Sequence, residues 1–333
     1  MRYTTFGRTG LRVSELVLGA MTFGEQGGVG APIEECRRIL DAYAEAGGNM
    51  VDTAINYRGG ASEEILGELL AGRRDRFVVA TKYTVTRDAT DPNGGGNHRK
   101  NLRLSLETSL RRLRTDHVDV YWVHIWDRHT PIEETMRALD DAVTAGKVLY
   151  VGVSDTPAWV VARANTLAEW RGWSPFVGLQ VPYSLINRDA ERELLPMAEA
   201  YGLSVTAWSP LGGGVLSGKY NAGSGDGRTR LSADTISDHD LGVARAVQEI
   251  ADELGGTPAQ VALAWIRHRD GVLPIIGART VDQLHDNLGC TAVTLAPELI
   301  TRLETVTGFS LGFPADFIAQ TSPWVLGAAS IAR

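Results

Sequence analysis

Short apolar runs alternate with longer amphipathic runs along this chain, and the alternation constrains its fold more than any other feature. The short runs are rich in β-branched residues, which is typical of strands buried on both faces of a parallel sheet. Between them, apolar residues recur at helical spacing. The expected strands are Leu16–Gly19, Met50–Asp52, Phe77–Lys82, Val118–His124, Val148–Ser154, Gly178–Val181, Leu203–Trp208 and Val272–Ile276.

Several strand ends lie about 30 residues apart, which is the length of one βα unit. The longest step, from 208 to 276, must hold a loop and more than one helix, and the step before 124 contains a polar, glycine-rich loop, Arg87–Asn97. Eight strand–helix units without antiparallel turn signals predict the α/β class and a closed (β/α)8 TIM barrel. The chain of 333 residues suits a single domain spanning residues 1–333.

Two segments lie outside the repeating units. Thr4–Phe6 and Leu11–Val13, joined by a turn that contains glycine, predict an N-terminal hairpin that could plug the bottom of the barrel. The C-terminal extension, Phe309–Arg333, is apolar and aromatic. We expect it either to fold over the barrel mouth as a specificity loop or to seal an exposed barrel edge.

Capping patterns mark three helix starts. Thr130, Thr257 and Thr280 are each followed three residues later by Glu or Gln, as in a capping box. The first two also have proline directly after the threonine. The arginine pairs 73–74 and 111–112 are expected to be solvated helix ends.

Charge and composition restrict the class of protein. The formal net charge of −7 argues against a nucleic-acid partner. Two cysteines far apart in sequence favour a reducing compartment. The N-terminal residues lack the apolar core of a signal peptide, and no apolar run reaches the length of a membrane span. We therefore expect a cytoplasmic protein with no membrane segment and no metal site, and the sequence is compatible with a homo-oligomer.

Ionisable residues stand at the ends of three neighbouring strands. Asp52 ends the second strand, Lys82 the third and His124 the fourth, and Tyr57 follows Asp52 by one short loop. Active sites of TIM barrels lie at the C-terminal ends of the strands. Each of these residues alone has a plain structural explanation, but the combination at matched strand ends favours catalysis.

A tyrosine, a lysine and a carboxylate together make a coherent proton donor. Free tyrosine has a pKa of about 10, and a nearby ammonium favours the phenolate and lowers that value. Asp52 would keep Lys82 charged, and His124 could hydrogen-bond a substrate carbonyl.

Several motifs in this order resemble those of the aldo-keto reductases. Asp52-Thr53-Ala54-Ile55-Asn56-Tyr57 followed by Ser62-Glu63 is similar to the family signature, and Thr81-Lys82 and Val118–His124 resemble its lysine and histidine motifs. The similarity runs roughly from Thr5 to Thr307 and includes the branch of potassium-channel β-subunit-like and bacterial members. It implies a (β/α)8 barrel that binds NADPH without a Rossmann domain, with Tyr57 as general acid, Lys82 and Asp52 tuning it, and His124 orienting the carbonyl.

The resemblance also implies a path for the cofactor. Ser154, Asp155 and Gln180 would bind the carboxamide, although asparagine is usual where Asp155 stands, and Trp208 would stack on the nicotinamide. A glycine-rich loop would approach the pyrophosphate, and Arg279 would favour the 2′-phosphate of NADPH. The full set of expected cofactor contacts is Gly19, Met21, Asp52, Ser154, Asp155, Gln180, Trp208, Ser209, Pro210, Leu211, Gly213, Gly218, Lys219, Ile276, Gly277, Arg279, Gln283, Asp286 and Asn287.

Three functions remain open at this point. The first is NADPH-dependent reduction of an aldehyde or ketone to an alcohol, with the substrate near Tyr57, His124 and Trp126. The second is a regulatory, cofactor-sensing subunit resembling potassium-channel β subunits. The third is a sugar-nucleotide ketone reductase of natural-product biosynthesis, whose large polar substrate the Arg87–Asn97 loop and the tail could admit.

Overall fold

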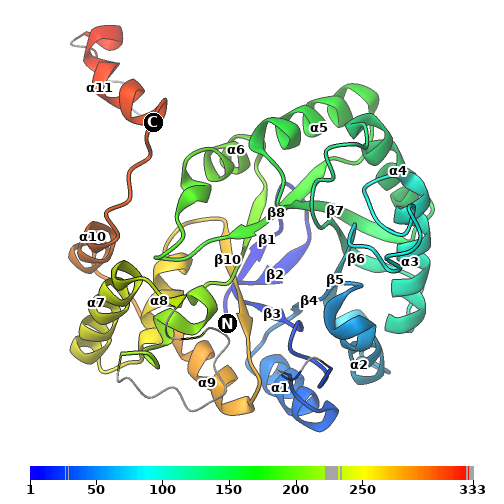
Figure 1. Cartoon of the computed structure of the whole chain (residues 1–333), viewed down its shortest axis with the longest axis horizontal. Helices are drawn as coiled ribbons and strands as arrows, with labels where there is room; N and C mark the ends of the chain where they lie inside the picture. The colour runs from blue at the N-terminus through cyan, green and yellow to red at the C-terminus, as the bar shows by residue number, and fades with distance from the viewer. Residues whose placement is uncertain (27, 29, 222–231, 233–234, 328, 330–333) are drawn as a thin grey trace.

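A computed structural model describes the chain except residues 27, 29, 222–231, 233–234, 328 and 330–333. Eight parallel strands close into a barrel in which each strand pairs with its neighbours in chain order and β10 closes against β3 (Figure 1). The barrel prediction is confirmed. The strands are β3 Val17–Gly19, β4 Met50–Asp52, β5 Val78–Tyr83, β6 Val118–Val123, β7 Val148–Ser154, β8 Phe176–Pro182, β9 Ser204–Trp208 and β10 Val272–Gly277.

Helices surround the barrel and cover the apolar outer faces of the strands (Figure 1). Two helices, α7 and α8, lie in the long step between β9 and β10, as predicted. The helices are α1 Ile33–Glu45, α2 Ala61–Leu69, α3 Arg99–Leu113, α4 Ile132–Thr144, α5 Ala158–Arg171, α6 Leu194–Tyr201, α7 Asp238–Leu254, α8 Pro258–Arg267, α9 Val281–Gly289, α10 Pro297–Val306 and α11 Ala315–Leu326.

The N-terminal hairpin pairs β1 Tyr3–Thr5 with β2 Arg12–Ser14 in antiparallel register and contributes to the barrel interior. Phe6 is fully buried and meets Trp122 of β6 edge to face, with ring centroids 6.2 Å apart. Two glycines of neighbouring strands leave room for the indole: a Cβ at Gly152 or Gly178 would lie 2.3 or 2.9 Å from Trp122. The hairpin therefore plugs the barrel, as expected.

The predicted helix caps have different outcomes. Thr257 forms a complete capping box with Gln260. Thr280 accepts from the Gln283 backbone N–H, but the Gln283 side chain accepts from Arg279 instead of completing the box. The cap predicted at Thr130 is wrong: α4 has Pro131 as its N-cap, and the Thr130 hydroxyl donates to Asp127 at 2.7 Å.

The C-terminal extension matches neither expectation. Helix α11 stands clear of the barrel, and it contains no buried residue in the part of the chain that the structure describes (Figure 1). The segment before α11 is anchored at Phe309, where the guanidinium groups of Arg188 and Arg192 lie 4.8 and 4.7 Å from the ring centroid. Among the helices of the described residues, none combines the length and apolar character needed to cross a membrane.

Candidate active site

The C-terminal ends of β4, β5 and β6 bring the four predicted catalytic residues together. The Lys82 ammonium is completely buried, pairs with the Asp52 carboxylate, and donates to the Tyr57 hydroxyl at 3.3 Å. The rings of Tyr57 and His124 meet nearly edge to face, with centroids 6.0 Å apart. Phenol, ammonium, carboxylate and imidazole thus share one rim of the barrel.

Further hydrogen bonds fix the ionic pair. The Lys82 ammonium also donates to the Thr53 carbonyl at 2.8 Å. Gln180 of β8 donates through Nε2 to the second carboxylate oxygen of Asp52 at 3.1 Å and to the hydroxyl of Thr206 at 3.2 Å. A buried ion pair is retained only when such bonds satisfy its remaining atoms.

The loop that carries Tyr57 is held from below by an arginine of α3. Arg112 donates to the Ile55 carbonyl at 2.8 Å and pairs with Glu63 of α2 at 3.2 Å. Glu63 is fully buried and accepts from Thr81, the neighbour of Lys82, at 2.7 Å. The prediction that Arg112 is a solvated helix end is therefore wrong.

Sequence reasoning missed this support because no spacing rule links the three residues. Glu63 itself could have been identified, because Ser62-Glu63 belongs to the segment that resembles the family signature. The prediction of a solvated helix end is also wrong for Arg74, because its guanidinium is largely buried and pairs with Asp119 at 2.6 Å.

Burial has the largest effect on the pKa of the Tyr57 phenol. It raises the pKa of Tyr57 above its usual 10, while the Lys82 ammonium acts in the opposite direction. The lysine therefore lowers the pKa of the tyrosine as expected, but its effect is outweighed. For Lys82, burial lowers the pKa and the Asp52 charge raises it, with a net rise above 10.5. At neutral pH the pair is a phenol beside an ammonium, which suits proton donation.

His124 is neutral at physiological pH. Burial, and then the nearby Lys82 charge, lower its pKa from 6.5 to about 3. Its Nδ1 atom is buried without a hydrogen-bond partner among the described residues. A neutral imidazole has one donor and one acceptor nitrogen, so it can orient a polar ligand without adding charge.

The ends of β7, β8 and β9 form the other half of the rim. Ser154 ends β7 with a buried hydroxyl that has no partner among the described residues. Asp155 follows it and accepts from the Trp208 indole N–H at 3.2 Å. Trp208, at the end of β9, is 39% exposed, so one part of its ring is open to a ligand. A buried hydroxyl and an open aromatic ring on the same half of the rim suit the carboxamide and ring of a nicotinamide.

A glycine-rich turn follows β9, where a pyrophosphate was expected. Gly213, Gly214 and Gly218 adopt positive φ angles, which glycine tolerates, and their lack of side chains leaves the backbone open to a ligand. The turn is held by Ser209, which accepts from the Gly213 N–H at 3.2 Å, and a Cβ at Gly214 would lie 2.5 Å from the Lys219 ammonium. Pro210 and Leu211 connect this turn to the strand.

The expected adenosine end lies after β10. Ile276 and Gly277 end the strand, and Arg279 directly precedes Thr280, the N-cap of α9. Helix N-termini offer free N–H groups to phosphate.

Two α9 side chains predicted to contact the cofactor bond to protein groups in this structure. Asn287 donates to the Gly277 carbonyl at 3.2 Å. Asp286 accepts from Thr257 and Gln260 of the α8 capping box, at 2.8 and 2.9 Å. These contacts leave their roles toward a cofactor as predictions.

Two further expected contacts lie on the first barrel strand and its loop. Gly19 ends β3, where a Cβ would lie 2.8 Å from the Ile275 side chain. Met21 is 37% exposed, and its carbonyl accepts from Arg58 at 3.0 Å. The loops after β3 and β4 are thereby tied together at the mouth.

Aromatic side chains stand at the entrance. Trp126, in the loop after β6, meets Trp159 at the start of α5 edge to face, with ring centroids 5.7 Å apart. Trp159 is 61% exposed.

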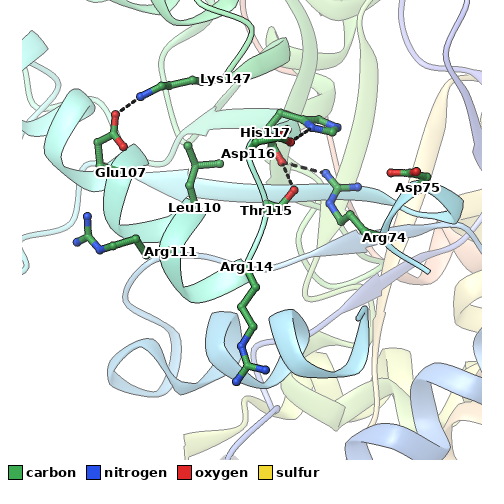
Figure 2. Close-up of a pocket in the computed structure, with 10 residues that line it drawn as sticks. All are labelled: Arg74, Asp75, Glu107, Leu110, Arg111, Arg114, Thr115, Asp116, His117 and Lys147. Carbon is green, nitrogen blue, oxygen red and sulfur yellow. Dashed lines mark hydrogen bonds and ion pairs between the residues drawn. The ribbon is translucent and has the colours of Figure 1, made fainter. Parts of the chain in front are cut away.

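A separate surface hollow of about 780 Å³ lies near the starts of β5, β6 and β7, at the opposite end of the barrel (Figure 2). Its charges are mostly satisfied locally, for example by the contact of Lys147 with Glu107. Its lining residues are Arg74, Asp75, Glu107, Leu110, Arg111, Arg114, Thr115, Asp116, His117 and Lys147. None of Asp52, Tyr57, Lys82 and His124 lines this hollow.

Comparison with known families decides the identity of the fold. Residues 15–307 match the model of the aldo/keto reductase family. The chain belongs to the aldo/keto reductase family. This is a family of oxidoreductases, and the resemblance drawn from the motifs is confirmed.

Three individual relatives are similar to this chain over most of their length. This aldo/keto reductase is 40% identical to norsolorinic acid reductase of Emericella nidulans, over 94% of this chain and 83% of the relative. It is 38% identical to a putative aryl-alcohol dehydrogenase of Saccharomyces cerevisiae, over 93% of this chain and 88% of the relative. It is also 38% identical to an NADP(+) aryl-alcohol dehydrogenase of Phanerodontia chrysosporium, over 92% of this chain and 85% of the relative.

Proposed function

We propose that this protein reduces an aromatic aldehyde or ketone to the alcohol with NADPH. The observation that carries the proposal is the contact of the Lys82 ammonium with the Tyr57 phenol, inside a rim whose Ser154 hydroxyl is buried without a partner among the described residues. A proton donor and a group that can bind the cofactor's carboxamide on one rim suit hydride transfer from a nicotinamide to a carbonyl.

Tyr57 acts as the general acid. It donates its proton to the carbonyl oxygen, and the Lys82 ammonium stabilises the phenolate that remains. Asp52 keeps Lys82 charged and in place through the buried ion pair. His124, neutral and beside the phenol, donates a hydrogen bond that orients the carbonyl.

The residues of the opposite rim would hold the cofactor, which supplies the hydride when bound. Ser154, Asp155 and Gln180 would bind the carboxamide, and Trp208 would cover the ring. Residues 209–219 would approach the pyrophosphate, and Arg279 beside the N-terminus of α9 would bind the 2′-phosphate. The NADP(+) in the name of the Phanerodontia relative supports this choice of cofactor.

The entrance supports an aromatic substrate. Trp126 and Trp159 form an edge-to-face pair beside the catalytic rim, and such pairs accept further rings by stacking. The relatives named for aryl alcohols and for norsolorinic acid point to the same chemical class.

The remaining parts of the proposal concern the whole chain. We propose that residues 1–333 act as one NADP-dependent oxidoreductase domain. Cys36 and Cys290 are both buried and free, which supports a reducing compartment such as the cytoplasm.

The test is NADPH oxidation followed at 340 nm with a panel of carbonyl compounds. The panel contains substituted benzaldehydes, aliphatic aldehydes of matched size and a nucleotide-linked ketosugar. We expect sustained turnover that is greatest with the aromatic aldehydes. Greater turnover with the ketosugar would contradict the substrate class and favour the sugar-nucleotide reductase. Tight NADPH binding with negligible turnover on every compound would instead favour the cofactor-sensing subunit.

A further inference from the structure

Asp155 places a carboxylate at the rim of the barrel, directly after β7. Its backbone has φ of 43°, a left-handed conformation that aspartate and asparagine tolerate better than most residues. Its Oδ1 accepts from the indole N–H of Trp208 at 3.2 Å. Asp155 forms no salt bridge with any described residue, so no cationic side chain is in direct contact with its carboxylate.

The Lys82 charge acts on Asp155, but the direct carboxylate partner of Lys82 is Asp52. The pKa of about 3 leaves His124 neutral at pH 7. Desolvation raises the pKa of the Asp155 carboxyl above 3.8, while the Trp208 hydrogen bond, the neighbouring Ser154 hydroxyl and the Lys82 charge oppose that rise. Asp155 follows the end of β7 and bonds to Trp208 at the end of β9, so its carboxylate lies on the rim that carries the catalytic residues.

The donors and acceptors beside Asp155 suit a primary carboxamide. Such a group offers two N–H donors and one carbonyl acceptor. The Ser154 hydroxyl has no partner among the described residues and can donate to the carbonyl. The Asp155 carboxylate can accept an N–H without being protonated. An aspartate therefore satisfies the amide as well as an asparagine would, but adds a negative charge.

We propose that the Asp155 carboxylate makes bound NADPH a stronger hydride donor, because it favours the oxidised form of the cofactor over the reduced form. This inference rests on the proposed function. In the reaction, the carbonyl carbon gains a hydride, the carbonyl oxygen gains the Tyr57 proton, and the nicotinamide ring changes from neutral to a charge of about +1. A carboxylate beside the ring stabilises that added charge, whereas an amide does not.

The test compares the dissociation constants of NADP+ and NADPH for the unaltered protein and for Asp155→Asn. Asparagine keeps an oxygen for the Trp208 N–H and tolerates the left-handed backbone. We expect Asp155→Asn to weaken NADP+ by roughly 5- to 30-fold relative to NADPH, the range for a unit charge a few ångströms away at a protein surface. Both constants are measured by titration calorimetry, which requires no turnover.

One control variant and one second test variant complete the experiment. Asp282→Asn removes an exposed carboxylate on α9 and must leave the ratio of the two constants unchanged. Asp155→Ser gives a second neutral side chain, so the ratio can be measured even if asparagine disturbs the loop. An unchanged ratio in both Asp155 variants, with both cofactor forms still bound, overturns the inference and leaves the proposed function standing. Failure of the unaltered protein to bind either form contradicts the proposed function instead.

Discussion

The guanidinium of Arg112 occupies the space that a side chain at Gly60 would need: a Cβ there would lie 2.3 Å from the Arg112 Cζ. Gly60 ends the short turn η1, Tyr57–Gly60, that begins with the proposed proton donor. The missing side chain lets Arg112 reach the Ile55 carbonyl beneath that turn. Packing of α3 against the loop after β4 therefore helps to position Tyr57 at the rim.

Gly60→Ala should displace Arg112 and disturb the Tyr57 loop. The new methyl group clashes with the guanidinium, and φ of 103° adds backbone strain. We expect a loss of about 2–4 kcal/mol in the free energy of unfolding and at least tenfold in kcat. Gly59→Ala is the matched control, because φ is 63° there and a Cβ would contact nothing within 4 Å. Equal losses in the two variants, measured by urea denaturation and steady-state kinetics, would contradict the steric argument.

Tyr57→Phe should remove the proton donor and leave the cofactor site intact. We expect reduction to slow by about a hundredfold or more, the usual effect of losing a general acid, with NADPH affinity nearly unchanged. Tyr201→Phe is the control, since it removes a hydroxyl that contacts Thr166 outside the rim. Near-normal reduction by Tyr57→Phe would remove Tyr57 from the mechanism.

Lys82→Met should leave the Asp52 carboxylate buried and unpaired. Breaking one partner of a buried pair costs about 3–5 kcal/mol, whereas removing both is far less costly. We therefore expect Lys82→Met combined with Asp52→Asn to be more stable than Lys82→Met alone, and equally inactive. Chemical denaturation measures the stability of each variant, and recovery of activity in the double variant would exclude Lys82 from catalysis.

His124 should make stability depend on pH in the acid range. Its pKa is about 3 in the folded protein and about 6.5 in the unfolded chain, so the unfolded chain binds more protons between these values. The contribution of His124 to the free energy of unfolding therefore rises with pH across this window, by at most about 1.4 kcal/mol per pH unit. His124→Gln should flatten the dependence between pH 4.5 and 6.5 in urea titrations. An unaltered slope would mean that the imidazole is not buried as described.

Arg279→Ala should weaken NADPH more than NADH. A guanidinium next to the α9 N-terminus suits the 2′-phosphate, which only NADPH carries. We expect the NADPH dissociation constant to rise about tenfold or more while that of NADH changes little. Equal losses for both cofactors in fluorescence titrations would rule out contact with the phosphate.

Local pattern was enough to predict the barrel and the grouping of Asp52, Lys82 and His124. Strand periodicity placed each residue at a strand end, and closure of a parallel barrel brings those ends to one rim. The largest difference in strand position is at β8, which begins at Phe176 instead of Gly178. Local pattern was insufficient at Thr130, because Asp127 accepts from both its backbone N–H and its hydroxyl and holds it outside the helix, which has Pro131 as its N-cap.

The sequence by itself determined the order of the elements, the strand faces and the residue types at the rim, because these depend on short-range spacing. Only the tertiary structure decided that Arg112 supports the Tyr57 loop, that Trp122 fills the space beside Gly152, and that α11 stands away from the barrel. Such contacts join residues far apart in the chain. They depend on how helices pack around the closed sheet, and no local periodicity encodes that packing.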